Sequence, residues 1–403
     1  VAAACLRDNY EQNHALALAR ADAPSLLDEH ARMIRALASR GRLDPEVERL
    51  PGDEAITERA SHGEGLTSPE LAVLLAYAKI DLEGKLLESD LATDAQLEHY
   101  LFAYFPARLR DRIHDLIAGH PLRREIITTA VVNTVVNRAG ISFAFRLAEE
   151  TGEPTIDIVR AHLAARALFD AEHRWSAIEA VENTVAFDAE QTMLLETRVL
   201  LEGAARWLLR RFSRPRDFAA LVERLVPDGA AVAAALPELL RGDHGAGVEQ
   251  RRQELLNAGV PSDLATAIAT ATATAAIPEI IELAHERGDQ PLAVAAVYFA
   301  LEARLRVDRL AQRIVSLPHR DRWTAAARSA LRDALADAQR NLSIDVLATT
   351  DAHLGPDERV EAWAATRAPT IAHYEATQTD LETAGTFDIT GLTVVVSELE
   401  SLT

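Results

Sequence analysis

Histidines, cysteines and glycine-rich strings are the first residues to test for chemistry in this 403-residue sequence. The chain has 13 histidines, but no two stand three or four residues apart, so no helix would present two imidazoles to one metal ion. The single cysteine, Cys5, lies in no local signature of a nucleophile. Gly63 and Gly65 lack the preceding strand and the third glycine of a dinucleotide-binding turn. We therefore predict no catalytic, cofactor-binding or metal-binding residue in this chain.

One polar row remains as a candidate interaction site, and we call it the polar seam. Its residues are His120, Arg123, Arg124, Glu125, Asn133, Asn137 and Arg138. Thr129, Asn133 and Asn137 repeat at four-residue steps, which places them on one helix face, and asparagine is a poor helix former. Two interpretations stay open. The seam could bind another part of the protein or an anionic ligand, or it could be a solvent-facing edge or a set of buried amides satisfied by a neighbouring helix.

The elements that would position these residues are helices. In segment 66–91, Thr67 and Glu70 have the spacing of a capping box, and Pro69 stands in the first turn, where its missing N–H costs nothing. The leucines that follow repeat at three and four residues, which predicts one apolar stripe. Similar periodicity predicts further helices at 24–40, 94–104, 121–139, 155–170, 187–213, 248–259, 262–276, 291–316, 320–340 and 357–384.

Three strings need a choice between helix, strand and loop. IITTAVVNTVV at 126–136 is β-branched, but Ile127, Val131 and Val135 align at four-residue steps, so we predict a helix. GDHGAG at 242–247 predicts a loop, and LTVVV at 392–396 is the last plausible strand. The sequence therefore predicts a mostly α protein in two packed helical lobes, at 61–213 and 248–403, with a connector at 214–247 and no Rossmann sheet.

Composition narrows the class of partner. The net charge of −20 argues against nucleic acid and anionic membranes, because an acidic surface repels phosphate. The longest apolar stretch falls far short of the roughly 20 residues that span a bilayer. A single cysteine excludes an internal disulfide and fits a reducing, cytoplasmic location. The start of the sequence, without an initiator Met or a signal peptide, is typical of the interior of a longer chain.

Several strings resemble, in order, the C-terminal region of the large bacterial NAD-specific glutamate dehydrogenases. They are LTSPELAVLLAYAKIDLEGKLLESDL at 66–91, YFPARLRDRIHDLIAGHPLRREIITTAVVNTVVNRAGISFAFRLAEETG at 104–152, RWSAIEAVENTV at 174–185, TRVLLEGAARWLLRR at 197–211, VYFALEARLRVDRLAQRIVSLP at 297–318 and RWTAAARSALRDALADAQRNL at 322–342. Together they cover essentially the whole chain. The opening string LRDNYEQNHALAL resembles the stretch where the catalytic domain of that family hands over to its helical region, so residues 1–60 would be the end of the catalytic domain and connecting helices.

The resemblance implies that this region is one part of a longer protein whose catalytic domain lies upstream. The full chain would convert L-glutamate, water and NAD to 2-oxoglutarate, ammonium and NADH, with NAD bound by the upstream catalytic domain and not by this region. The family's catalytic lysines lie in glycine-rich context, whereas the only lysines here, Lys79 and Lys85, lie on a predicted amphipathic helix. The resemblance also implies a homo-oligomer and the upstream catalytic domain of the same chain as a partner. In the first interpretation of the polar seam, the seam would bind that domain. The alternatives are an effector-binding module or a stand-alone helical interaction scaffold without catalysis.

Overall fold

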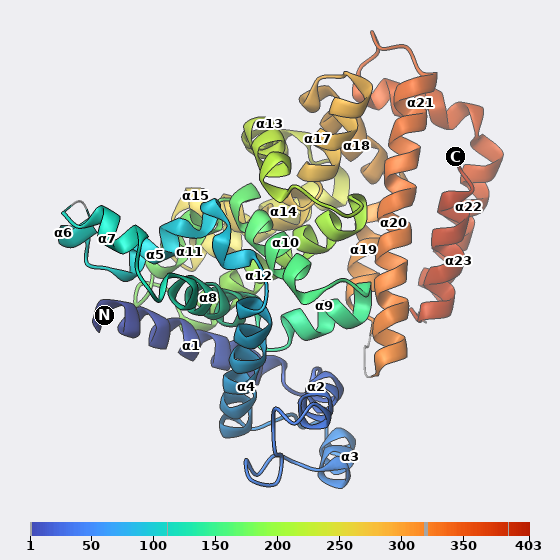
Figure 1. Cartoon of the computed structure of the whole chain (residues 1–403). Helices are drawn as coiled ribbons and strands as arrows, with labels where there is room; N and C mark the ends of the chain where they lie inside the picture. Colours follow the sequence, from blue (N-terminus) through green and yellow to red (C-terminus); the bar gives the residue numbers. More distant parts are fainter. Residues whose placement is uncertain (1, 111, 318–320, 386) are drawn as a thin grey trace. The chain divides into compact units, whose positions relative to one another are not determined.

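The computed structural model describes residues 2–110, 112–317, 321–385 and 387–403, and every regular element in these ranges is helical (Figure 1). The predicted mostly α fold is confirmed for these residues. Contacts divide the chain into two compact units. Unit 1 comprises residues 1–165 and 201–216, and unit 2 comprises residues 166–200 and 217–403. The domain boundaries predicted from the sequence stay predictions.

The helices are named in chain order. The first part of the chain contains α1 (Ala2–Asp22), α2 (Leu27–Ser39), α3 (Asp53–His62), α4 (Ser68–Leu87), the short 3-10 turns η1 (Leu91–Thr93) and η2 (Ala95–Leu97), α5 (Glu98–Tyr104), α6 (Ala107–Arg110), α7 (His114–Ala118), α8 (Arg123–Thr134), the π-helical turn η3 (Val135–Ala139), α9 (Phe143–Thr151), α10 (Thr155–Leu168), α11 (Ala171–Glu179) and α12 (Phe187–Arg211). The remainder contains α13 (Phe218–Leu239), α14 (Gly242–Asn257), α15 (Ser262–Ala269), α16 (Ala271–Thr274), α17 (Ile277–Arg287), α18 (Pro291–Leu305), α19 (Val307–Val315), α20 (Arg322–Thr349), α21 (Pro356–Thr366), α22 (Ala368–Ala384) and α23 (Ile389–Glu400).

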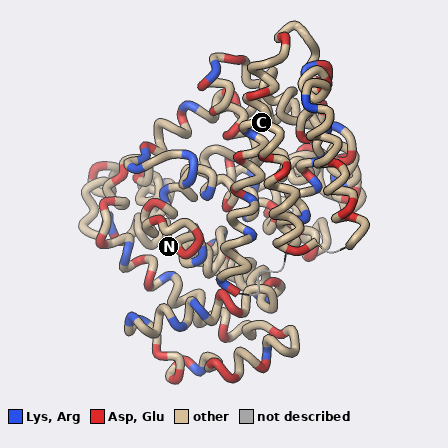
Figure 2. The backbone as a smooth tube through the Cα atoms, turned by 90° about the vertical axis from the view of Figure 1, so that its right-hand side faces the viewer, with Lys and Arg blue, Asp and Glu red and all other residues tan. Residues whose placement is uncertain are grey.

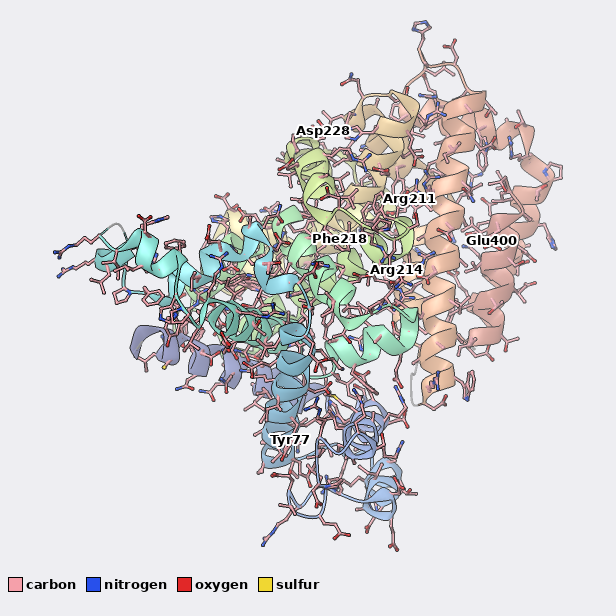
Figure 3. All side chains as sticks on the ribbon, in the orientation of Figure 1. Tyr77, Arg211, Arg214, Phe218, Asp228 and Glu400 are labelled. Carbon is pink, nitrogen blue, oxygen red and sulfur yellow. The ribbon has the colours of Figure 1, made fainter. Side chains whose placement is uncertain are left out.

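Helix α4 forms as the sequence predicts. The backbone N–H of Thr67 donates to Glu70 Oε2 at 2.7 Å, which satisfies one of the free donors at the helix start. Leu71, Leu74, Leu82 and the other apolar residues of the predicted stripe are buried. On another face of α4, Tyr77 donates its hydroxyl to Glu48 Oε1 at 2.7 Å (Tyr77 is labelled in Figure 3).

The β-branched segment 126–136 is helical, which confirms the prediction, and it ends in an unusual turn. Ile127, Val131 and Val135 are buried on one face of α8 and η3. Residues 135–139 form a π turn, a widened helical turn that is rare and often found at functional sites. Gly140 ends it with φ 111°, a backbone conformation that residues with a Cβ rarely adopt.

Two local predictions are wrong, and in both cases tertiary packing decides. GDHGAG is not a loop: it is the first part of α14, where His244 is buried and lies 2.5 Å from Glu302 Oε1 on α18. LTVVV is not a strand but part of α23. Asp388 caps that helix by accepting from Gly391 N at 2.8 Å. The buried residues of α23 follow the spacing of a helix stripe: Leu392, Val395, Val396 and Leu399.

Other segments differ from the prediction in where a helix breaks. The predicted helix at 291–316 is two helices, because Arg306 adopts a left-handed conformation with φ 56° between α18 and α19. The predicted helix at 357–384 is divided at Arg367 into α21 and α22. The predicted connector at 214–247 contains the 22-residue helix α13, although its role as a connector stays a prediction.

Unit 2 has its core around α18, which packs against α13, α17, α20 and α21, while α20 lies along α23 (Figure 1). In the described part of the chain no single helix is long and apolar enough to cross a membrane, although two strongly bent helix pairs reach that length and hydropathy together. Figure 2 shows acidic residues interspersed with basic ones along the backbone, so the net charge of −20 is not confined to one segment.

Candidate functional site

The first half of the polar seam makes contacts with nearby residues, and Arg124 caps the end of a helix. The Arg124 guanidinium donates to the backbone carbonyl of Leu87, with Nε at 3.1 Å, and also to Ser89 O, so it caps the C-terminal end of α4. Arg123 Nη1 lies 2.6 Å from Glu98 Oε1. His120 Nδ1 accepts from Leu122 N at 3.1 Å. Of the remaining seam residues, Glu125 is exposed and Asn133 is half-buried.

The second half of the seam faces α1. Asn137 and Arg138 lie in the π turn and are 3% and 8% exposed. Asn137 Nδ2 donates to Asp8 Oδ1 at 2.9 Å, and Arg138 Nη2 lies 2.9 Å from Glu11 Oε1. A π turn holds one residue more than an α turn, and here it directs two successive side chains toward the same helix. The structure therefore separates the seam into a local capping half and a half that binds α1.

A lysine completes the contact with α1. Lys79 Nζ, on α4, lies 3.9 Å from Asp8 Oδ1. Burial lowers the pKa of Lys79, and the charges of Asp8 and Glu11 act in the opposite direction. We call these five residues, Asp8, Glu11, Lys79, Asn137 and Arg138, the α1 junction. In the α1 junction, two carboxylates of α1 contact Lys79 of α4 and the Asn137 and Arg138 side chains of the π turn. These contacts are suited to holding α1 in place and not to chemistry on a substrate.

Unit 1 also contains a buried ion network that sequence reasoning missed. Arg146 on α9 donates to both carboxylate oxygens of Glu202 at 2.6 Å, and its Nε lies 3.3 Å from Glu29 Oε1. Glu150 lies 2.6 Å from Arg206 and 3.6 Å from Arg146. Burial raises the pKa of Glu29, although the charge of Arg146 opposes this shift. We call these five residues the Arg146 network. They come from three helices, so no local motif could have indicated it.

The neighbouring carboxylates Glu149 and Glu150 contact different arginines. Glu149 Oε2 lies 3.1 Å from Arg32 Nε, while Glu150 turns to Arg206. These two residues therefore serve packing and charge balance.

Unit 2 has one buried histidine–carboxylate cluster. His244 pairs with Glu302, and Gln339 Nε2 donates to the other oxygen of Glu302 at 3.4 Å. Burial opposes protonation of His244, but the hydrogen bond to Glu302 and the charges of Glu302 and Asp308 outweigh it, so the pKa of His244 is raised. The contact between His244 and Glu302 therefore anchors the start of α14 on α18.

In unit 1, both lysines and the charged residues that line one cavity form ion pairs. Within the described ranges, no three His, Cys, Asp or Glu side chains come together in a way that could hold a metal ion. Lys85 pairs with Asp81 at 2.6 Å along α4, and Lys79 belongs to the α1 junction, so neither lysine lies in a glycine-rich turn. A cavity of about 290 Å³ in unit 1 is lined in large part by apolar side chains. Its charged lining residues already form ion pairs: Arg40, Asp81, Lys85 and Glu149.

Comparison with known proteins gives a consistent set of relatives. Residues 63–401 match the family model described as "Glutamate dehydrogenase, C-terminal". Over its full length the chain is 36% identical to an NAD-specific glutamate dehydrogenase of Mycobacterium tuberculosis, of which it covers 25%. A protein with the same description from Pseudomonas aeruginosa is 35% identical over 402 residues and is covered to 25%, and one from Halomonas elongata is 35% identical over 360 residues and is covered to 22%. The chain thus spans about a quarter of the length of these curated relatives.

Proposed function

This chain belongs to the C-terminal region of the NAD-specific glutamate dehydrogenases, and from that premise we propose that it is a helical support for a dehydrogenase domain that precedes it in a longer protein. The complete protein would oxidise L-glutamate with NAD and water, and it would release 2-oxoglutarate, ammonium and NADH. In this proposal the chain contributes no catalytic residue. Its helices hold the preceding segment in place through the α1 junction.

The observation that carries the proposal is the position of α1 relative to the matched region. Helix α1 spans Ala2–Asp22 and lies outside the residues matched by the C-terminal family model, which begin at 63. Its carboxylates nevertheless pair with buried or half-buried groups of α4 and the π turn, which lie inside the matched region. A buried ion pair requires its partner, since removing one member leaves an uncompensated charge. The α1 junction is therefore suited to fixing the end of the preceding domain on the C-terminal helices.

Cofactor, assembly and location follow from the same proposal. We place the NAD site in the preceding domain, because a dinucleotide fold needs β-strands before a glycine-rich turn and the described residues of this chain form helices and loops. We also propose a homo-oligomer, the usual state of such enzymes. A cytoplasmic location is proposed on the basis of a single, exposed cysteine, Cys5.

The test uses the complete protein with Arg138→Gln, and Arg123→Gln as the matched control. Arg138→Gln removes the arginine that joins Glu11 to the π turn and leaves Arg7, which contacts Glu11 from within α1. Arg123 also pairs with a glutamate, Glu98, but that glutamate lies outside α1. We expect Arg138→Gln to reduce the hydrogen-exchange protection of α1 and to lower the rate of NAD-dependent glutamate oxidation, while Arg123→Gln changes neither. If α1 loosens and the rate is unchanged, the supporting role is refuted. Unchanged protection of α1 would show that the junction does not hold it.

A further inference from the structure

Helix α19 carries a row of arginines that the proposed function does not use. Arg309 and Arg313 stand four residues apart on one face of α19, and Arg306 immediately precedes the helix. All three line one cleft of unit 2, and we call them the arginine row. The apolar residues Val307, Leu310 and Ile314 of α19 are buried.

The arginine row borders a cleft of about 420 Å³ within unit 2, which we call the α19–α22 cleft. Polar groups from both helices line it, including Gln312, Ser316 and Gln378. Its apolar wall consists of Leu310, Leu381 and Phe387. The cleft is therefore large enough for more than a single small inorganic ion, and it offers both charged and apolar surface.

The charges in the cleft are unevenly compensated. Arg309 pairs with Asp243 and lies 3.6 Å from Glu382. Among the described residues, no ion pair joins a carboxylate to Arg306 or Arg313. The Arg313 guanidinium lies 3.9 Å above the ring of Phe387, which holds it at the cleft wall. Like charges three and four residues apart on a helix repel each other, so an anion between these arginines would relieve the repulsion.

The position of Arg306 is fixed by a strained backbone and by buried hydrogen bonds. Its φ of 56° is left-handed, which is unusual for a residue with a Cβ. The helix break leaves the carbonyl of Leu305 without its helical partner. That carbonyl accepts from Tyr374 Oη at 2.8 Å and from Gln378 Nε2 at 3.3 Å. Tyr374 and Gln378 are both buried on α22. Backbone strain that the surrounding structure holds in place is concentrated at ligand sites.

We propose that the α19–α22 cleft binds a small organic anion with at least two negative charges, carried by carboxylate or phosphate groups. Arg306 and Arg313 bind the charged groups, because a guanidinium matches the geometry of either oxyanion with paired hydrogen bonds. Leu381 and Phe387 contact the apolar part of the ligand. This inference goes beyond the supporting role proposed above and does not depend on it, since binding is measured directly and without the enzymatic reaction.

The experiment measures binding of citrate and of pyrophosphate to the complete protein by calorimetry, at constant ionic strength maintained with chloride. Arg306→Gly removes the charge and also relieves the strained backbone, because glycine adopts positive φ without cost. Arg313→Gln removes the second charge. Arg252→Gln is the control: Arg252 lies in the same unit on α14 and pairs with Glu249 at 2.7 Å, outside the cleft.

We expect saturable binding of at least one of the two anions, with citrate or pyrophosphate preferred according to whether the natural ligand carries carboxylates or phosphates. Arg306→Gly and Arg313→Gln should each weaken binding about tenfold or more, as expected for loss of a charged hydrogen-bond donor, and Arg252→Gln should not. Arg306→Gly should at the same time raise the thermal midpoint. The proposal is overturned if the wild type binds neither anion, if Arg252→Gln weakens binding equally, or if Arg306→Gly stabilises the protein and leaves the affinity unchanged.

Discussion

Replacing Arg146 with methionine tests the Arg146 network most directly. Methionine fills part of the space of the arginine but removes the cation that Arg146 supplies to Glu202 and Glu29, while Glu150 keeps Arg206 at 2.6 Å. Removing one member of a buried ion pair costs about 3–5 kcal/mol. The side chains of Glu29 and Glu202 are 6% and 18% exposed, so water screens the stranded charges poorly. We therefore expect a loss in that range for local unfolding of α9.

The assay is native-state hydrogen exchange of α9 and α2 in the complete protein. A loss of about 3–5 kcal/mol lowers the protection of these amides by roughly two to three and a half orders of magnitude, at 1.4 kcal/mol per factor of ten. The matched control is Arg160→Met, whose partner Asp90 is 77% exposed, and an exposed pair is worth about 0–1 kcal/mol. An equal loss in both variants would refute the argument that burial sets the cost.

The pH dependence of the Arg146→Met variant follows from Glu29. The pKa of Glu29 in the folded protein is already raised by burial, so its ionisation destabilises the fold as pH rises above the ordinary value of 4.5. Without Arg146 the pKa of Glu29 rises further. The difference in stability between variant and wild type should therefore increase as pH rises above 4.5. Adding Glu29→Gln to the variant should abolish this increase, because the titrating carboxyl is then absent. A loss that is independent of pH would contradict this reasoning.

Three further predictions concern single positions. A Cβ at Gly65 would lie 2.2 Å from a backbone carbonyl carbon in the turn after α1, so Gly65→Ala should lower the thermal midpoint. A Cβ at Gly203, within α12, would meet open space, so Gly203→Ala should raise the midpoint slightly. Scanning calorimetry measures both midpoints. Tyr374→Phe removes one of the two donors to the Leu305 carbonyl at the α18–α19 break and leaves Gln378, so it should cost about 0.5–1.5 kcal/mol in the hydrogen-exchange protection of α19. The raised pKa of His244 contributes stability that is complete below pH 6.5 and is lost as pH rises through the pKa of the folded protein. The hydrogen-exchange protection of the start of α14 should therefore fall with rising pH. His244→Gln should abolish this dependence.

The elements that could be predicted from the sequence are those whose signals are local. Helix α4 has its capping residues, Thr67 and Glu70, and its leucine stripe within one segment, so spacing alone identifies it. The start of α14 could not be identified in this way. Its glycines indicate a loop, and the contact that fixes it as helix joins His244 to Glu302, 58 residues later. In α23 the β-branched run suggested a strand, but burial at helical spacing overrides β-propensity.

The candidate sites show the same distinction. The sequence identified Asn137 and Arg138 as unusual because two asparagines stand on one predicted helix row, but it could not identify Asp8 and Glu11 as their partners. The pairing depends on a π turn, which has no reliable signature in one sequence. The arginine row of α19 is visible from its spacing. Its cleft is not, because α22 supplies the opposite wall from about 70 residues further along the chain.

The measurement that tests the central claim most directly compares this 403-residue chain with the complete protein in NAD-dependent oxidation of L-glutamate, followed by NADH absorbance. Far-UV circular dichroism first establishes that the isolated chain is helical, as the structure requires. The account predicts activity in the complete protein and none in the helical 403-residue chain. Glutamate oxidation by the isolated chain would contradict it, because these helices would then contain a nucleotide site and catalytic groups of their own.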